Sequence, residues 1–227
     1  MINVFLVPVG ADRHDLYCEI PLEDLTPTAE ADAAAAPPWW RKRLYRFQHL
    51  LAQAEDERRR RELGETVESS GLWRWVMRKI AESVAEQRLL WILRRLSAAA
   101  LVHPADQSAE RALEITRTAL RRDFEKHRRW LVIDTLLMVL CLPLTIIPGP
   151  NVPSLYFFFR AIGHYLAWRG ARSGIGLVAW EPRASTELTE VRAALTLPPA
   201  ARRQRVDALA AALGLERLGP FVDRVTG

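Results

Sequence analysis

The sequence predicts a mainly α fold, a helical bundle that contains an apolar helical hairpin and carries a small β-hairpin at its N-terminus. Three observations favour this fold. Apolar residues recur at helical spacing through residues 39–129, the region 130–170 is almost free of charge, and two short strand-like runs lie near the N-terminus. The chain has 227 residues, 49% of them hydrophobic, which is enough to bury a core and excludes disorder of the whole chain.

The first region, residues 1–23, is predicted to be a β-hairpin. Residues 2–9 and 16–20 are rich in β-branched and aromatic side chains, and the polar residues 10–15 between them are typical of a turn. Residues 24–38 mix Thr, Pro, Asp and Ala and end in two prolines. We therefore expect a linker at 24–38.

Residues 39–129 are predicted to form an amphipathic helical region. The apolar face of its first helix is formed by Trp40, Leu44, Phe47, Leu51 and Ala54. This helix ends near Gly64, and a second runs from Leu72 to Leu101. A third begins at Asp106 or Ser108, either of which can cap a helix, and no stop signal separates it from Trp130.

The C-terminal residues 183–227 are predicted to form a small helical module. A break at Trp180-Glu181-Pro182 precedes it. Three Ala/Leu-rich segments follow, at residues 185–195, 199–213 and 218–225. We expect these segments to form two or three short helices.

The apolar stretch between Trp130 and Phe159 holds thirty residues with a single charge, Asp134. Such a run is long enough for a helix to cross a bilayer, but the Pro-Gly-Pro at residues 148–150 cannot lie inside a regular helix. The chain must therefore turn back. We expect two helical arms within 130–170, joined by a turn that contains Pro148, Pro150, Asn151 and Pro153.

Three features favour a membrane location for this hairpin. Residues 135–159 carry no charge, arginines flank both ends of the hairpin, and Trp130 and Trp168 stand where the arms would meet an interface. The positive flanks predict that both ends lie on the cytoplasmic side of an inner membrane. The alternative is that the hairpin is the buried core of a soluble helical bundle.

Four polar side chains of the hairpin are candidates for a proton or ion path. Folding the arms about Pro150 and Asn151 sets Asp134 level with the helical turn that holds His164. Arg160 and His164 are four residues apart, and Tyr156 extends the same helical face. Ionisable residues inside a membrane usually pair or line a polar path. The alternative for Asp134, Tyr156, Arg160 and His164 is a buried structural hydrogen-bond cluster.

A second surface is predicted to contact lipid. Tryptophans lie beside arginines at the start of residues 39–129, as is typical of a helix at a membrane interface. The candidates are Trp39, Trp40, Arg41 and Arg43, with Trp130 and Trp168 at the hairpin. The net charge of +5 is too small to indicate nucleic acid, so anionic lipid is the preferred partner.

The hairpin resembles the core pattern of the mitochondrial K+/H+ exchange-related family. The residues that carry the resemblance are Pro143-Leu144-Thr145, Pro148, Pro150-Asn151-Val152-Pro153, Phe159-Arg160, Gly163-His164, Ala167 and Gly170. The resemblance implies membrane association and a part in potassium/proton balance. Gly149 and the arginine-rich helices depart from what we expect of mitochondrial members, which indicates a bacterial-type relative.

No motif for catalysis is present. The chain has no phosphate-binding loop and no metalloprotease or serine-hydrolase signature, and its five histidines are scattered singly. We therefore expect no enzyme, no metal and no cofactor.

These observations predict a non-enzymatic protein of the inner (cytoplasmic) membrane, its bulk on the cytoplasmic side. It contributes to K+/H+ homeostasis as a component or regulator of an exchanger. The expected partners are anionic lipid, K+ and H+, and a protein partner or a second copy of the chain. Two other classes stay open, a soluble helical adaptor whose hairpin is buried core and an arginine-driven nucleic-acid binder.

Overall fold

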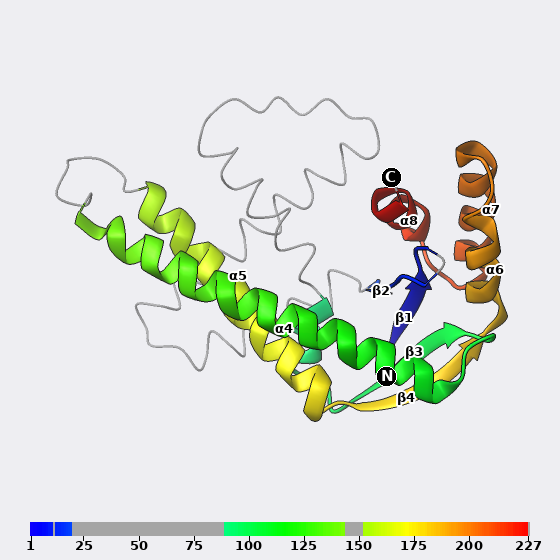
Figure 1. The fold of residues 1–227 in the computed structure, drawn as a ribbon, viewed down its shortest axis with the longest axis horizontal. Coiled ribbons are helices and arrows are strands. Elements are labelled where there is room, and N and C mark those ends of the chain that lie inside the picture. The colour runs from blue at the N-terminus through cyan, green and yellow to red at the C-terminus, as the bar shows by residue number, and fades with distance from the viewer. Residues whose placement is uncertain (11, 20–88, 144–151, 227) are drawn as a thin grey trace. The chain divides into compact units, whose positions relative to one another are not determined.

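The computed structural model describes residues 1–10, 12–19, 89–143 and 152–226, and over these residues the fold is mixed α/β (Figure 1). The chain divides into two compact units. The first contains Met1–Glu19, Leu89–Arg129 and Tyr165–Gly227, and the described part of the second consists of residues 130–143 and 152–164.

The first unit contains a four-stranded sheet in the order β2-β1-β3-β4 (Figure 1). Its strands are β1 (Ile2–Pro8), β2 (His14–Tyr17), β3 (Ala98–Pro104) and β4 (Ala179–Ser185). β2 runs antiparallel to β1, whereas β1, β3 and β4 are mutually parallel. The carboxyl ends of the three parallel strands therefore lie together on one side of the sheet, which we call its carboxyl edge, and β2 begins there.

Strand β1 packs on both of its faces. Phe5 and Val7 belong to a core cluster with the three C-terminal helices, α6 (Thr186–Ala194), α7 (Pro199–Ala212) and α8 (Leu218–Thr226). The alternate residues Val4 and Leu6 belong to clusters on the opposite face. A strand that is covered on both faces reads as a continuous apolar run, as Val4 to Val7 does.

Two long helices follow the third strand and precede the fourth, α4 (Ala109–Leu140) and α5 (Val152–Gly176). α4 begins after Ser108, whose hydroxyl accepts a hydrogen bond from the Arg111 amide at 3.3 Å. In the first unit, α4 contributes Leu120 and α5 contributes Ala167 and Ala171 to the cluster beneath β1.

Gly170 lets α5 approach the helical turn at residues 89–93. A Cβ atom at position 170 would lie 1.6 Å from the Leu90 carbonyl oxygen, so only glycine fits there. The neighbouring Ala167 and Ala171 are fully buried. The small residues on this face of α5 are therefore a packing requirement.

The predicted mainly α bundle is wrong, because the structure contains a four-stranded sheet. The N-terminal hairpin is present as β1 and β2, yet β1 also pairs with β3, which the sequence analysis placed at the end of the helix 72–101. The run Ala98-Ala99-Ala100-Leu101 has high helix propensity and no alternation of polar and apolar residues. Burial in the sheet overrides that propensity. The break expected at Trp180-Glu181-Pro182 is the edge strand β4, where a proline is tolerated.

The predicted membrane hairpin is also corrected. Within residues 89–143 and 152–226, no helix combines the length and the apolar character that crossing a bilayer requires. The physical reason is that α4 and α5 both carry charged residues along their length. The first half of α4 is highly charged, and Arg160, Arg169 and Arg172 divide α5.

Several expected elements lie outside the described residues. They are the linker at 24–38, the helix at 39–64, most of the helix 72–101 and the hairpin turn at Pro148, Pro150 and Asn151. Pro153 belongs to α5. The structure has α6, α7 and α8 where the sequence predicts two or three short C-terminal helices.

Candidate functional site

A buried polar cluster lies between α4 and α5 in the second unit. Its centre is Asp134, whose side chain is 1% exposed. The Oδ2 atom of Asp134 accepts a hydrogen bond from Arg160 Nε at 3.2 Å and lies 3.4 Å from His164 Nε2. One carboxylate oxygen thus meets a permanent cation and an imidazole that can become one.

Helix geometry places the other members of the cluster. Tyr156, Arg160 and His164 follow one another at intervals of four on α5, and residues with this spacing share a helix face. The Tyr156 hydroxyl accepts a hydrogen bond from Arg160 Nη1 at 3.2 Å. The structure therefore brings together all four polar residues that the sequence analysis selected.

Trp130 covers the same cluster from one turn before Asp134. The Arg160 guanidinium carbon lies 5.3 Å from the Trp130 ring centroid, and the His164 ring stacks on that indole at 6.3 Å. The indole faces the two groups that pair with Asp134, so it limits their contact with water.

The Asp134 carboxylate is held in an electrostatic balance. Burial raises the pKa of Asp134, and the charge and hydrogen bond of Arg160 oppose that rise. The Oδ1 atom is buried and has no hydrogen-bond partner among the residues that the structure describes. A carboxylate in this position can take up a proton, since its second oxygen is not committed.

The cluster does not have the composition of a metal site. Among the described residues, no three His, Cys, Asp or Glu side chains come close enough together to hold a metal ion. The groups clustered with Asp134 are a guanidinium, an imidazole and a phenol. This chemistry suits proton binding and charge pairing.

The predicted lipid-interface residues have different outcomes. Trp39, Trp40, Arg41 and Arg43 lie outside the described residues. Trp130 is exposed and belongs to the Asp134 cluster, as described above. Trp168 is half-buried in the first unit, where its ring lies 5.7 Å from that of Phe124.

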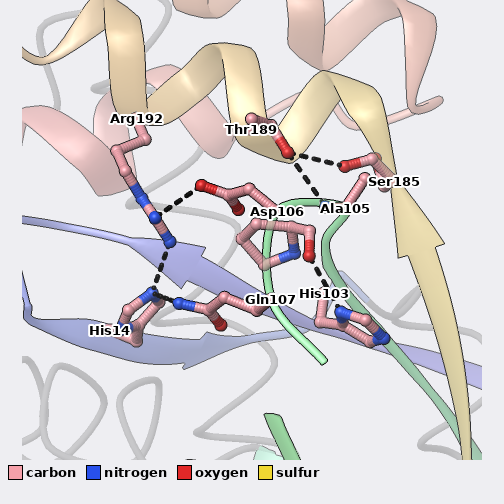
Figure 2. Close-up of polar contacts among 9 residues, drawn as sticks. His14, His103, Ala105, Asp106, Gln107, Ser185, Thr189 and Arg192 are labelled. Atoms are coloured by element: carbon pink, nitrogen blue, oxygen red, sulfur yellow. Dashed lines mark hydrogen bonds and ion pairs between the residues drawn. The ribbon is translucent and has the colours of Figure 1, made fainter. Parts of the chain in front are cut away.

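A second polar cluster, which the sequence analysis missed, lies in the first unit at the edge where the parallel strands end (Figure 2). It joins His14 at the start of β2, Asp106 and Gln107 in the turn after β3, and Arg192 on α6. The carboxyl edge of a parallel sheet is where polar side chains converge. The cluster could be found from the sequence only by predicting β3 and β4, because these strands form the carboxyl edge of the sheet.

Arg192 and Gln107 both point at one nitrogen of His14 (Figure 2). Arg192 Nη2 lies 3.1 Å from His14 Nε2, and Gln107 Nε2 lies 2.8 Å from the same atom. Arg192 Nη1 also donates to Asp106 Oδ2 at 2.6 Å. A guanidinium can only donate, so His14 Nε2 must accept and the imidazole is neutral.

Comparison with known proteins bears on the whole N-terminal three quarters of the chain. The sequence model of a family described as mitochondrial K+-H+ exchange-related matches residues 3–173. The matched range includes β1 from its second residue, β2, β3, α4 and most of α5, and with them every residue of the Asp134 cluster. No curated protein and no solved structure gave a significant match.

Proposed function

This chain belongs to the mitochondrial K+-H+ exchange-related family, and from that membership we propose that it acts in K+/H+ exchange as a regulator or a component of the exchanger. We further propose that it catalyses no chemical reaction and that Asp134, Tyr156, Arg160 and His164 are its proton-responsive site. One observation carries the proposal. A buried carboxylate pairs through one oxygen with both a guanidinium and an imidazole, inside the region that the family match covers.

Proton uptake changes the charge of this cluster. With a neutral imidazole, the carboxylate of Asp134 and the guanidinium of Arg160 cancel. A proton on either Asp134 or His164 leaves one uncompensated positive charge, which is unfavourable where water is limited. Arg160 is 26% exposed and can turn toward water, whereas Asp134 cannot. Protonation therefore favours a rearrangement of α5 against α4 in this unit.

The test measures proton movement after a K+ jump in membrane vesicles from cells that make or lack the chain. We expect K+-driven proton flux to depend on the chain and to fall with Asp134→Asn, which removes the charge but keeps the shape. Glu125→Gln makes the same chemical change at a surface ion pair with Arg128 and serves as the matched control. Flux that is identical with and without the chain would refute the proposal.

A second candidate function, binding at a membrane surface, is favoured by an apolar helix face. Large apolar side chains of α4 are exposed in the second unit, with Leu136 64% and Leu140 73% exposed. The other members of this exposed face are Val132, Ile133 and Val139. Isolated exposed apolar residues are ordinary, but a continuous face of this kind marks an interaction surface.

We propose that this exposed face contacts anionic lipid at the surface of the inner membrane, because Arg128 and Arg129 precede it directly on α4. The assay is flotation of the full chain with vesicles of phosphatidylglycerol or of phosphatidylcholine. We expect binding to the anionic vesicles and its loss in Leu136→Gln/Leu140→Gln. Equal flotation with both lipids would contradict a preference for anionic lipid, and none with either would contradict a lipid partner and favour a protein one.

A further inference from the structure

The second polar cluster, at the carboxyl edge of the sheet, connects elements that are far apart in the sequence. His14 begins β2, Gln107 follows β3 and Arg192 lies in the last turn of α6. α6 also places Leu188 and Val191 in the core against Phe5 and Val7 of β1. A contact between His14 and Arg192 therefore helps to hold the C-terminal helices on the sheet.

We propose that His14, Gln107 and Arg192 form a proton-operated latch, which ties strand β2 to helix α6 while the imidazole is neutral and opens when the imidazole is protonated. The two donors at 2.8 and 3.1 Å require a lone pair on His14 Nε2. A proton on this nitrogen replaces that acceptor with a third donor and places two positive charges at contact distance.

Gln107 and Arg192 differ in how they can respond. The Oε1 atom of Gln107 is buried without a hydrogen-bond partner among the described residues. Rotation of the amide would present this oxygen to a protonated Nε2, so Gln107 can keep its contact with His14 in both states. Arg192 has no acceptor to offer. Because its charge stays paired with Asp106, it can move away from His14 without becoming an unpaired cation.

Charged groups on every neighbouring element bear on this equilibrium. Burial and the charge of Arg192 lower the pKa of His14, while Asp12 on the preceding turn and Asp106 after β3 act in the opposite direction. The lowering prevails, so the latch is closed at neutral pH. It opens in acid as the pH falls through the lowered pKa of His14.

The test is an NMR titration of the His14 imidazole in the full chain, combined with amide-exchange protection factors of α6. We expect the His14 pKa to lie below that of a free imidazole and to rise in Arg192→Gln. Arg205→Gln removes a surface pair with Glu190 on the same helical module and should leave it unchanged. An Arg192→Gln variant with an unaltered His14 pKa would overturn the proposal.

The second measurement keeps the proposal testable if Arg192→Gln does not fold. Protection of the α6 amides should fall in acid. The fall should be tenfold for each unit by which the pKa of His14 is lower in the closed state than in the open state. His14→Gln offers an amide oxygen to Arg192 at every pH, so its protection should not depend on pH. If His14→Gln loosens in acid as the wild type does, another group is responsible and the latch is wrong.

Discussion

The pairing of Asp134 with Arg160 predicts an asymmetry between the two single substitutions. Arg160→Gln leaves the Asp134 carboxylate at 1% exposure without its permanent cation. Removing one partner of a buried pair costs about 3–5 kcal/mol, and we expect the lower end, about 3 kcal/mol, because His164 stays near Oδ2. Asp134→Asn instead leaves Arg160, whose side chain reaches water, and should cost about 1–2 kcal/mol.

The double substitution completes the cycle. With both charges removed, neither group is left buried and unpaired, so the double variant should be more stable than the sum of the single losses predicts. The expected coupling is about 1–3 kcal/mol, as is usual for residues in contact. The assay is amide exchange within residues 131–140 and 156–164, which reports the opening free energy of this unit itself.

Acid should reduce the loss in Arg160→Gln. Burial raises the pKa of Asp134, and the charge that opposed this rise is gone in the variant. The folded state then binds a proton at a pH where the unfolded carboxyl, with its ordinary pKa of 3.8, does not. Stability of the variant should therefore increase as the pH falls through the raised pKa toward 3.8. Additive single losses, or a loss independent of pH, would refute a charge pair at this site.

Three further predictions concern the first unit. Gly170→Ala forces a Cβ to within 1.6 Å of the Leu90 carbonyl oxygen and should lower the free energy of unfolding by at least about 1–3 kcal/mol in a urea titration. Gly176→Ala should be nearly neutral, because a Cβ at position 176 would meet no atom within 4 Å. Burial lowers the pKa of His127 to about 4. The free energy of unfolding, measured by circular dichroism, should therefore decrease by up to about 3 kcal/mol as the pH falls from 6.5 toward 4. His127→Gln should remove that dependence on pH. Ser185→Ala removes the hydroxyl that caps α6 at the Leu188 amide and should cost about 1 kcal/mol, seen as faster exchange of the first-turn amides; unchanged exchange would show that the cap is not needed.

Local signals in the sequence were sufficient for some parts of this fold. The polar turn at residues 10–15 between two β-rich runs predicts the antiparallel pair β1 and β2, which the structure contains. Capping and apolar spacing predict a third helix from Asp106 or Ser108 that continues past Trp130, and α4 does so from Ala109 to Leu140. Each of these signals lies within the segment that it describes.

The parallel strands could not be predicted in this way. β3 is fixed by its neighbours β1 and β4 and not by its own residues, because alanines fill the space between two helical layers as well as they fill a helix. The misreading of β3 and β4 then concealed the edge where His14, Asp106 and Arg192 meet. A contact that depends on three distant segments leaves no periodic trace in any one of them.

The polar cluster around Asp134 is an intermediate case. Folding the apolar stretch about Pro150 and Asn151 sets Asp134 level with the helical turn that holds His164, and the two side chains lie 3.4 Å apart in the structure. Helical spacing also relates Tyr156, Arg160 and His164. The surroundings of this cluster were predicted wrongly. The charge-free run at 135–159 was interpreted as part of a membrane hairpin, although the two helices that contain it carry charged residues on either side of the run.

The central claim is that Asp134 and its partners make K+/H+ exchange responsive to protons. The pH profile of K+-driven proton flux tests it most directly. Vesicles that contain the wild-type chain, Asp134→Asn or the control Glu125→Gln would be given the same K+ jump at a series of pH values. We predict a pH-dependent step in flux that wild type and Glu125→Gln share and that Asp134→Asn lacks. A profile that Asp134→Asn leaves unchanged would contradict the account.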